Sequence, residues 1–166
     1  MRILGIDPGY GITGFGLIEA ERNRFELLRY GAITTPAGAD FSARLEMIYE
    51  DMRKLLELAK PDAVAIEELF FGHNVTTAIG VAQSRGVILL AIRQAGLEVA
   101  QYKPMQVKQA VVGYGGATKH QVQDMTRRLL RLETVPKPDD AADAIAIALC
   151  HARASTSLLA KAIQNL

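Results

Sequence analysis

The stretch that decides the fold is Ile3-Leu4-Gly5-Ile6-Asp7-Pro8-Gly9. Its apolar run predicts a short buried strand over residues 2–7, and a proline and a glycine after the acid are typical of a turn. An acid at the end of a buried strand loses hydration unless it is paired, binds a metal or faces a cleft. Asp7 is therefore either an ordinary turn residue or the first member of a functional site.

The rest of the chain continues with strands and helices at short spacing. Further strands are predicted over residues 13–21, 24–35, 63–67 and 99–102, with Asn23 in the turn between the first two of these. Helices are predicted over residues 42–59, 75–95, 104–112, 118–132 and 139–154. Because short links join the first three strands, they should form an antiparallel meander. The sequence thus predicts an α/β fold, a mixed five-stranded sheet flanked by helices.

The chain has the size and composition of one globular domain. Of its 166 residues, 49% are hydrophobic and 22% are charged, and no apolar run approaches the roughly 20 residues that span a bilayer. We expect a single domain over residues 1–154, a C-terminal tail over 155–166, no signal peptide, no membrane partner and a cytoplasmic location. The only cysteine, Cys150, lies in an apolar stretch and is predicted to be a small buried side chain.

Basic residues are concentrated in one part of the chain, although the net charge is only +1. Between Gln101 and Lys137 seven bases stand against two acids, whereas between Asp40 and Glu68 eight acids stand against four bases. Such an asymmetry favours the binding of a polyanion to one face. Solvated helix faces would give the same pattern, so both interpretations stay open.

Three more acids hold positions that deserve a functional interpretation beside the ordinary one. Glu67 ends an apolar strand, where it is either an exposed rim residue or a neighbour of Asp7 on an adjacent strand. Asp140 and Asp143 stand three apart, which places them on one face of a helix. Asp139 and Asp140 suit the positive end of the helix dipole, but Asp143 is surrounded by alanine and isoleucine. A carboxylate in such surroundings needs a partner.

Carboxylates brought together repel one another unless a cation holds them. Oxygen donors without a histidine–cysteine pairing favour Mg²⁺ or Mn²⁺ over zinc. Two such ions can activate a water molecule and stabilise the attacking and leaving oxygens in phosphodiester hydrolysis. We therefore predict a catalytic site that holds two divalent ions. Its ligands are Asp7, Glu67, Asp140 and Asp143, and Asp7 bridges the two ions.

Six short motifs, in order along the chain, resemble the RuvC family of bacterial Holliday-junction resolvases. They are Gly5-Ile6-Asp7-Pro8-Gly9, Ala65-Ile66-Glu67, Gln83-Ser84-Arg85-Gly86-Val87, Gln106-Val107-Lys108-Gln109-Ala110-Val111-Val112-Gly113, Lys119-His120-Gln121-Val122-Gln123 and Asp140-Ala141-Ala142-Asp143-Ala144. The similarity runs from residue 3 to about His151 without a large gap. Each motif alone is weakly specific, whereas six in sequence are highly specific.

The resemblance implies an RNase H-like fold and a homodimer, formed through the helix at residues 75–95, that nicks two opposed strands of four-way junction DNA. It also implies cooperation with the RuvA–RuvB branch-migration complex. It gives the four acids the role of metal-binding catalytic residues.

The resemblance assigns DNA contacts as well. Lys108 and Lys119 match basic positions that the family uses at the DNA, with Lys119 close to the scissile phosphate. Phe70 resembles the aromatic residue that wedges into the centre of the junction. Phe71 and His73 depart from the commoner pattern of the family, so which aromatic residue enters the junction stays open.

We therefore interpret the chain as a structure-selective endonuclease that resolves Holliday junctions in recombination and repair, with Lys119 stabilising the charge that builds on the phosphate. An RNase H-type nuclease acting on RNA–DNA hybrids would use the same acids and stays an alternative. Two lesser alternatives are an actin-like nucleotide-binding protein, whose phosphate loop Asp-Pro-Gly also resembles, and a protein that binds junctions without cutting them.

Overall fold

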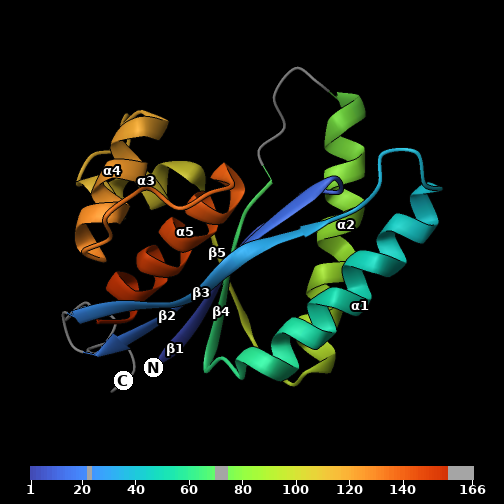
Figure 1. Cartoon of the computed structure of the whole chain (residues 1–166), viewed down its shortest axis with the longest axis horizontal. Coiled ribbons are helices and arrows are strands. Elements are labelled where there is room, and N and C mark those ends of the chain that lie inside the picture. Colours follow the sequence, from blue (N-terminus) through green and yellow to red (C-terminus); the bar gives the residue numbers. More distant parts are fainter. Residues whose placement is uncertain (22–23, 70–74, 157–166) are drawn as a thin grey trace, which may run out of the picture.

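The computed structural model describes residues 1–21, 24–69 and 75–156 (Figure 1). Within these residues lie five strands: β1 (Arg2–Asp7), β2 (Ile12–Glu21), β3 (Arg24–Thr34), β4 (Ala63–Glu67) and β5 (Val99–Tyr102). The same part of the chain contains five helices: α1 (Phe41–Ala59), α2 (Val75–Gln94), α3 (Pro104–Val112), α4 (Lys119–Leu129) and α5 (Asp139–Thr156). The turn predicted at Asn23 lies outside the described residues.

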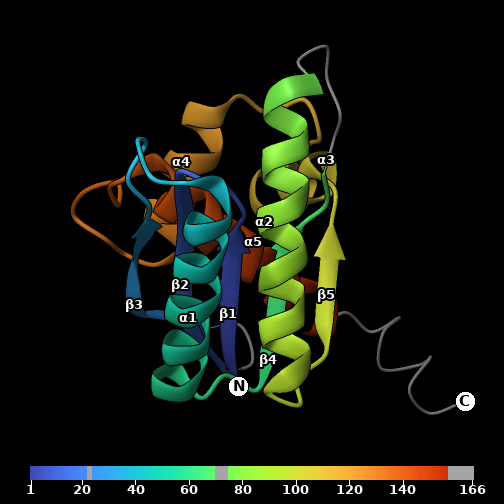
Figure 2. The same cartoon turned by 90° about the vertical axis from the view of Figure 1, so that its right-hand side faces the viewer.

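The strands form one mixed sheet in the order β3-β2-β1-β4-β5. β1, β2 and β3 pair as an antiparallel meander, whereas β4 is parallel to both β1 and β5. The carboxyl ends of β1, β4 and β5 therefore lie at one edge of the sheet, which is the upper edge in Figure 2. The predicted α/β fold, the meander and the mixed five-stranded sheet are confirmed.

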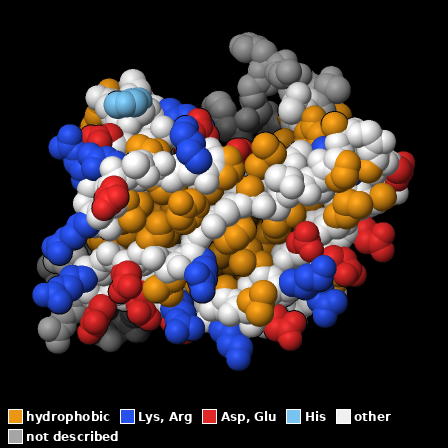
Figure 3. All heavy atoms as spheres, viewed as in Figure 1, with side chains coloured by type: hydrophobic (Ala, Val, Ile, Leu, Met, Phe, Trp, Pro, Cys, Tyr) orange, Lys and Arg blue, Asp and Glu red, His pale blue; other side chains and the backbone are white. Residues whose placement is uncertain are grey.

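Helices cover both faces of this sheet. α1 and α2 lie side by side on one face, and α5 lies on the other, with α3 and α4 packed against it (Figures 1 and 2). In the view of Figure 3, hydrophobic side chains gather over the middle of the molecule, and charged side chains lie mainly around the rim. No helix in the described ranges combines the length and apolar character needed to cross a bilayer.

The two helical layers bury different kinds of side chain. Under α1 and α2 the core consists mainly of large aliphatic residues, among them Ile48, Met52 and Ile88. Under α5 many of the buried helix residues are alanines. Cys150 belongs to this second core and is 2% exposed, as predicted for a small buried side chain.

Glycines let α5 come very close to the sheet. A methyl group on Gly5 would stand 2.0 Å from the carbonyl oxygen of Ala144, and one on Gly14 would stand 2.0 Å from the carbonyl oxygen of Asp140. No side chain fits into either space, so the backbones of sheet and helix are in direct contact. The register pairs Gly14 with Asp7, and the start of α5 is thereby held beside the end of β1.

α4 ends earlier than predicted. The sequence favoured a helix through Leu132, but the helix ends at Leu129. Arg131 has a left-handed φ of 55°, and the amides of Arg131 and Leu132 donate to the carbonyl oxygens of Arg128 and Arg127. This is a Schellman turn with arginine in the place that glycine usually takes. The other boundaries differ from the predicted ones by no more than one or two residues.

Candidate active site

Two acids lie side by side at the carboxyl edge of the sheet. Asp7 is the last residue of β1 and Glu67 is the last residue of β4, its parallel neighbour. The preceding residues, Ile6 and Ile66, are paired and belong to the core under α1 and α2. Because side chains alternate along a strand, Asp7 and Glu67 point to the opposite face, toward α5.

The first turns of α5 bring two more acids to this edge. Asp140 and Asp143 lie near the start of the helix, which packs across β1 and β2. The carbonyl oxygen of Asp140 lies against Gly14, the β2 partner of Asp7. The structure therefore gathers the four acids that the sequence singled out, and it does so from β1, β4 and α5.

Burial and mutual repulsion make these acids difficult to ionise together. Burial, followed by the charges of Glu67, Asp143 and Asp140, raises the pKa of Asp7 to about 8. Burial and the charge of Asp143 raise the pKa of Glu67. Burial raises the pKa of Asp143 as well, against the opposing effect of a hydrogen bond from Lys119. At neutral pH the cluster therefore favours the binding of positive charge.

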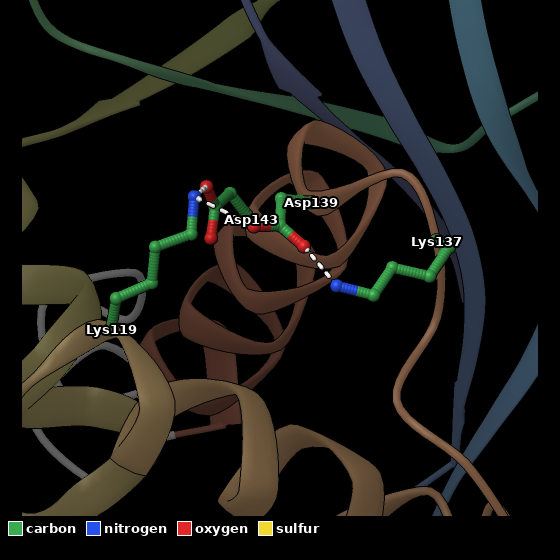
Figure 4. Close-up of polar contacts among 4 residues, drawn as sticks. All are labelled: Lys119, Lys137, Asp139 and Asp143. Atoms are coloured by element: carbon green, nitrogen blue, oxygen red, sulfur yellow. Dashed lines mark hydrogen bonds and ion pairs between the residues drawn. The ribbon is translucent and has the colours of Figure 1, made fainter.

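Two lysines supply positive charge at the site. Lys119, the first residue of α4, donates from Nζ to Asp143 Oδ2 at 2.7 Å and lies 3.9 Å from Asp139 Oδ2 (Figure 4). Lys108 of α3 lines a cavity of about 170 Å³ together with Glu67, Lys119 and Asp143. The two basic residues that the resemblance assigned to the DNA thus stand beside the acids.

The predicted wedge residue cannot be placed in this site. Phe70 lies outside the described residues, as do the neighbouring Phe71 and His73. Just before them, the amide of Glu68 donates to the carbonyl oxygen of Tyr102 at 2.8 Å, so the pairing of β4 with β5 continues to that point. The role of the aromatic residues stays a prediction.

One residue that the sequence analysis missed fixes the loop after Asp7. Arg44 of α1 donates from Nη2 to the carbonyl oxygen of Tyr10 at 3.1 Å and from Nε to the hydroxyl of Thr35 at 2.9 Å. Its guanidinium is buried with these partners, since the residue is only 8% exposed. The signal was its position four residues before Ile48, within the apolar stripe of α1.

The sequence analysis also missed the ion pair between Lys137 and Asp139, which lies beside Lys119. Asp139 accepts a hydrogen bond at Oδ1 from Lys137 Nζ at 2.6 Å, while its Oδ2 faces Lys119 (Figure 4). In the sequence, Asp139 is explained by the helix dipole, as any first-turn acid is. Only the packing of α4 against α5 shows which lysine its carboxylate faces.

The donor chemistry of the acid cluster fits a hard divalent cation. Its donors are carboxylate oxygens, which Mg²⁺ and Mn²⁺ prefer, and the raised pKa of Asp7 shows that they are close enough to repel. Within the part of the chain that the structure describes, no three histidine, cysteine or acidic side chains are already arranged to hold an ion. Lys119 instead lies against Asp143. Cation binding therefore requires these side chains to rearrange.

Sheet order and acid placement define the class: an α/β protein of RNase H-like fold whose carboxylates gather at the carboxyl edge of the sheet. The family model described as Crossover junction endodeoxyribonuclease RuvC matches residues 3–151. The chain is 58% identical to Crossover junction endodeoxyribonuclease RuvC of Heliobacterium modesticaldum, over 94% of this chain and 96% of that protein. It is 56% identical to the Brevibacillus brevis protein of the same name, over 92% of each chain. The chain belongs to the RuvC family of crossover junction endodeoxyribonucleases.

Solved structures agree with this assignment. The structure of T. thermophilus RuvC in complex with Holliday junction substrate matches with a TM-score of 0.89 and 37% identity, over 94% of this chain and 95% of that one. The yeast mitochondrial Holliday junction resolvase Ydc2 matches with a TM-score of 0.72 at 14% identity, over 99% of this chain and 84% of that one. The second likeness concerns the fold alone. The RNase H-like fold and the family expected from the sequence are confirmed.

Proposed function

We propose that this protein resolves Holliday junctions as a divalent-metal-dependent endonuclease that nicks two opposed DNA strands. It belongs to a family of crossover junction endodeoxyribonucleases, and it shares the fold of a relative whose structure contains a Holliday junction. The observation that carries the proposal is the convergence of Asp7, Glu67, Asp140 and Asp143 from three separate elements. Burial raises the pKa values of Asp7, Glu67 and Asp143, and such a group of acids is costly in a purely structural protein and typical of a functional site.

The four acids are the residues that would hold the metal. When two Mg²⁺ or Mn²⁺ ions are bound, they supply positive charge at the phosphodiester and lower the pKa of water. The chain contributes oxygen donors that repel one another without such charge, because burial and three neighbouring carboxylates raise the pKa of Asp7 to about 8. Relief of this repulsion favours cation binding.

The lysines would act on the DNA. Lys119 lies beside the acids and would stabilise the negative charge that develops on the scissile phosphate, and Lys108 would bind a phosphate at the same cavity. Hydrolysis adds water across the bond between phosphorus and the 3′-oxygen. The products are a 3′-hydroxyl and a 5′-phosphate, so the nick can be sealed by a ligase.

A homodimer would place two such sites on a junction that is itself nearly two-fold symmetric. α2 supports this assembly because it exposes Ile79 (57%) and Leu90 (50%), two large apolar side chains. Phe70 remains our candidate for the residue that enters the junction. We also keep RuvA and RuvB as expected partners and the cytoplasm as the expected compartment, on the basis of membership in the RuvC family.

Family membership favours four-way junctions over RNA–DNA hybrids, which the acids alone did not distinguish. A junction-binding protein without nuclease activity is disfavoured because all four acids are present and lie together. A nucleotide-binding protein is disfavoured by the same family match.

Replacing Asp7 by asparagine tests the proposal directly. Asp7→Asn keeps the size of the side chain but removes a carboxylate that would hold the metal, so we expect junction binding to survive and cutting with Mg²⁺ or Mn²⁺ to fall by about a thousandfold or more. Binding is measured by gel shift without divalent ions, and cutting by the release of labelled arms from a synthetic junction.

A matched control is Asp51→Asn, which makes the same change at an exposed acid paired with Lys54 on α1. It should cut like the wild type. If Asp7→Asn still cuts the junction, the assigned site is wrong. If the wild type cuts a hybrid duplex faster than the junction, the site stands but the substrate is wrong.

A further inference from the structure

Lys119 stands between two carboxylates on the same face of α5. Its Nζ is 2.7 Å from Asp143 Oδ2 and 3.9 Å from Asp139 Oδ2. The two acids are four residues apart, so they are neighbours along one side of the helix. The lysine is anchored on the opposite side by the start of α4, where Thr118 caps the helix through the amide of Gln121. A short movement of the side chain would therefore exchange one carboxylate for the other.

Asp139 is held in an orientation that suits this exchange. Its Oδ1 accepts a hydrogen bond from Lys137, which leaves Oδ2 facing Lys119. Figure 4 shows the two lysines approaching Asp139 from opposite sides. Asp139 thus has a lysine ammonium group on each side, at 2.6 Å from Oδ1 for Lys137 and at 3.9 Å from Oδ2 for Lys119. It is also the one acid of this group that we do not assign to the metal.

Asp143 cannot keep its close ion pair with Lys119 while it also binds a metal ion. The acid is 30% exposed and its Oδ2 is taken by the ammonium group. A divalent cation that binds Asp143 would lie close to Lys119, and two positive charges at that separation repel. The ion pair with Asp143 must therefore loosen when the metal binds, although Lys119 is needed nearby for the phosphate.

We propose that a divalent cation displaces Lys119 from Asp143, and that Asp139 is the positioning residue that then keeps Lys119 at the site. The inference rests on the proposed function, because it takes Asp143 as a metal ligand. In the metal-free protein Lys119 acts as an internal cation that partly neutralises the acids. In the metal-loaded protein, Lys119 pairs with Asp139, and this interaction offsets the free energy lost when Lys119 leaves Asp143.

The first test is the affinity of the protein for Mn²⁺, measured by calorimetric titration without DNA. Lys119→Met removes the internal competitor and should tighten Mn²⁺ binding by about 3- to 10-fold, the effect of one partly screened charge at contact distance. Lys137→Met is the matched control, because it removes a lysine that pairs with Asp139 and not with Asp143. It should change the affinity by less than about 2-fold. Equal effects of the two substitutions would overturn the displacement.

The second test is a double-mutant cycle that isolates Asp139. Asp139→Asn leaves Lys119 without its second carboxylate and should weaken Mn²⁺ binding by about 2- to 5-fold. In the Lys119→Met background the same change should have a clearly smaller effect, because only the general loss of one negative charge remains. Asp139→Glu keeps the carboxylate and should restore most of the affinity.

The cycle also separates this inference from the proposed function. An Asp139→Asn effect of equal size in both backgrounds would show that Asp139 acts only as a distant charge, and would overturn its positioning role. If Asp7→Asn and Lys119→Met both left Mn²⁺ binding unchanged, the metal site itself would be misplaced. Because no DNA or cleavage enters these titrations, they do not depend on a loss of nuclease activity.

Discussion

The two faces of the sheet are packed in opposite ways. On the α1–α2 face, long aliphatic side chains fill the space between sheet and helices, and Ile48, Met52 and Ile88 are each no more than 1% exposed. On the α5 face, the backbone of the sheet touches the backbone of the helix at Gly5 and Gly14, where a methyl group would stand 2.0 Å from a carbonyl oxygen. Both faces carry a hydrophobic core, but only the α5 face adds direct contact between main chain and main chain at these two glycines.

This difference gives the two faces different roles. The α1–α2 face mainly contributes stability, whereas the α5 face fixes the geometry of the site. A layer of aliphatic side chains removes a large apolar area from water and can adjust to a change of volume. A backbone contact has no such freedom, so the position of α5 is fixed relative to β1 and β2. Because α5 carries Asp140 and Asp143, the glycines set how far these acids lie from Asp7. Substitutions on the two faces should therefore have different consequences.

The largest effect is expected from Gly14→Ala. The new methyl group would meet the carbonyl oxygen of Asp140, so the start of α5 must move away from Asp7. We expect junction cleavage to fall by about 100-fold or more, since misplacing catalytic groups by about 1 Å has that cost. Overpacking should also lower the free energy of unfolding by about 1–3 kcal/mol. Single-turnover cleavage and chemical denaturation measure the two effects.

Gly38→Ala is the matched control for this change. Gly38 lies in the turn before α1, and a methyl group there would meet no atom within 4 Å. Both cleavage and stability should stay as in the wild type. Similar losses at Gly14 and Gly38 would mean that the backbone contact with α5 has no special role in the site.

The opposite face should respond in stability and not in activity. Met52 of α1 is fully buried, and Met52→Ala should lower the free energy of unfolding by about 2–5 kcal/mol through lost burial and a cavity. Cleavage per folded molecule should be unchanged, because the acids do not depend on this layer for their spacing. Denaturation curves and rates measured well below the unfolding transition test this. A large loss of rate in fully folded Met52→Ala would remove the distinction between the faces.

A smaller effect concerns the acids themselves and depends on pH. The pKa of Asp7 rises from its ordinary value of 3.8 to about 8 in the folded protein, mainly through burial. Between these values the folded state binds more protons than the unfolded state, so stability falls as pH rises. Without divalent ions, Asp7→Asn should lie within about 1 kcal/mol of the wild type near pH 4 and exceed its stability by a few kcal/mol near pH 8, up to about 5 kcal/mol by linkage.

Denaturation at several pH values, with and without Mg²⁺, measures this difference. Added Mg²⁺ should stabilise the wild type at pH 8 and so narrow its gap to Asp7→Asn. Asp51→Asn, which lies outside the cluster, should show no such trend. A wild type that gains stability over Asp7→Asn as pH rises would show that Asp7 already has a stabilising partner in the metal-free protein.

The fold was largely readable from the sequence because its signals are local. The apolar run that ends at Asp7, the apolar strand that ends at Glu67 and the short links between the first strands led to the observed mixed sheet. The end of α4 was not readable, because Arg131 adopts the left-handed conformation that glycine usually marks. Because arginine and not glycine occupies this position, the sequence did not predict the turn, although its hydrogen bonds are those of a regular Schellman turn.

The sequence pointed to the acids of the candidate site but not to the residues that surround them. Asp7 and Glu67 end strands, and Asp140 and Asp143 share one helix face, so local patterns pointed to all four. The roles of Asp139 and Arg44 depend on which helix packs against which loop, and no local pattern contains that. The close contact at Gly14 also becomes visible only when α5 is in place.

The smallest effect should come from the ion pair inside the site. Lys119 and Asp143 are 2.7 Å apart, but their side chains are 55% and 30% exposed, and ion pairs this open to solvent contribute little stability. Lys119→Met should therefore change the free energy of unfolding by less than about 1 kcal/mol. Lys54→Met, which breaks a pair at 3.0 Å between side chains that are 64% and 50% exposed, is the matched control and should behave alike. If Lys119→Met instead cost as much as Met52→Ala, the lysine would belong to the structural part of the molecule, and the main chain around Gly14 would not be enough to keep the acids in place.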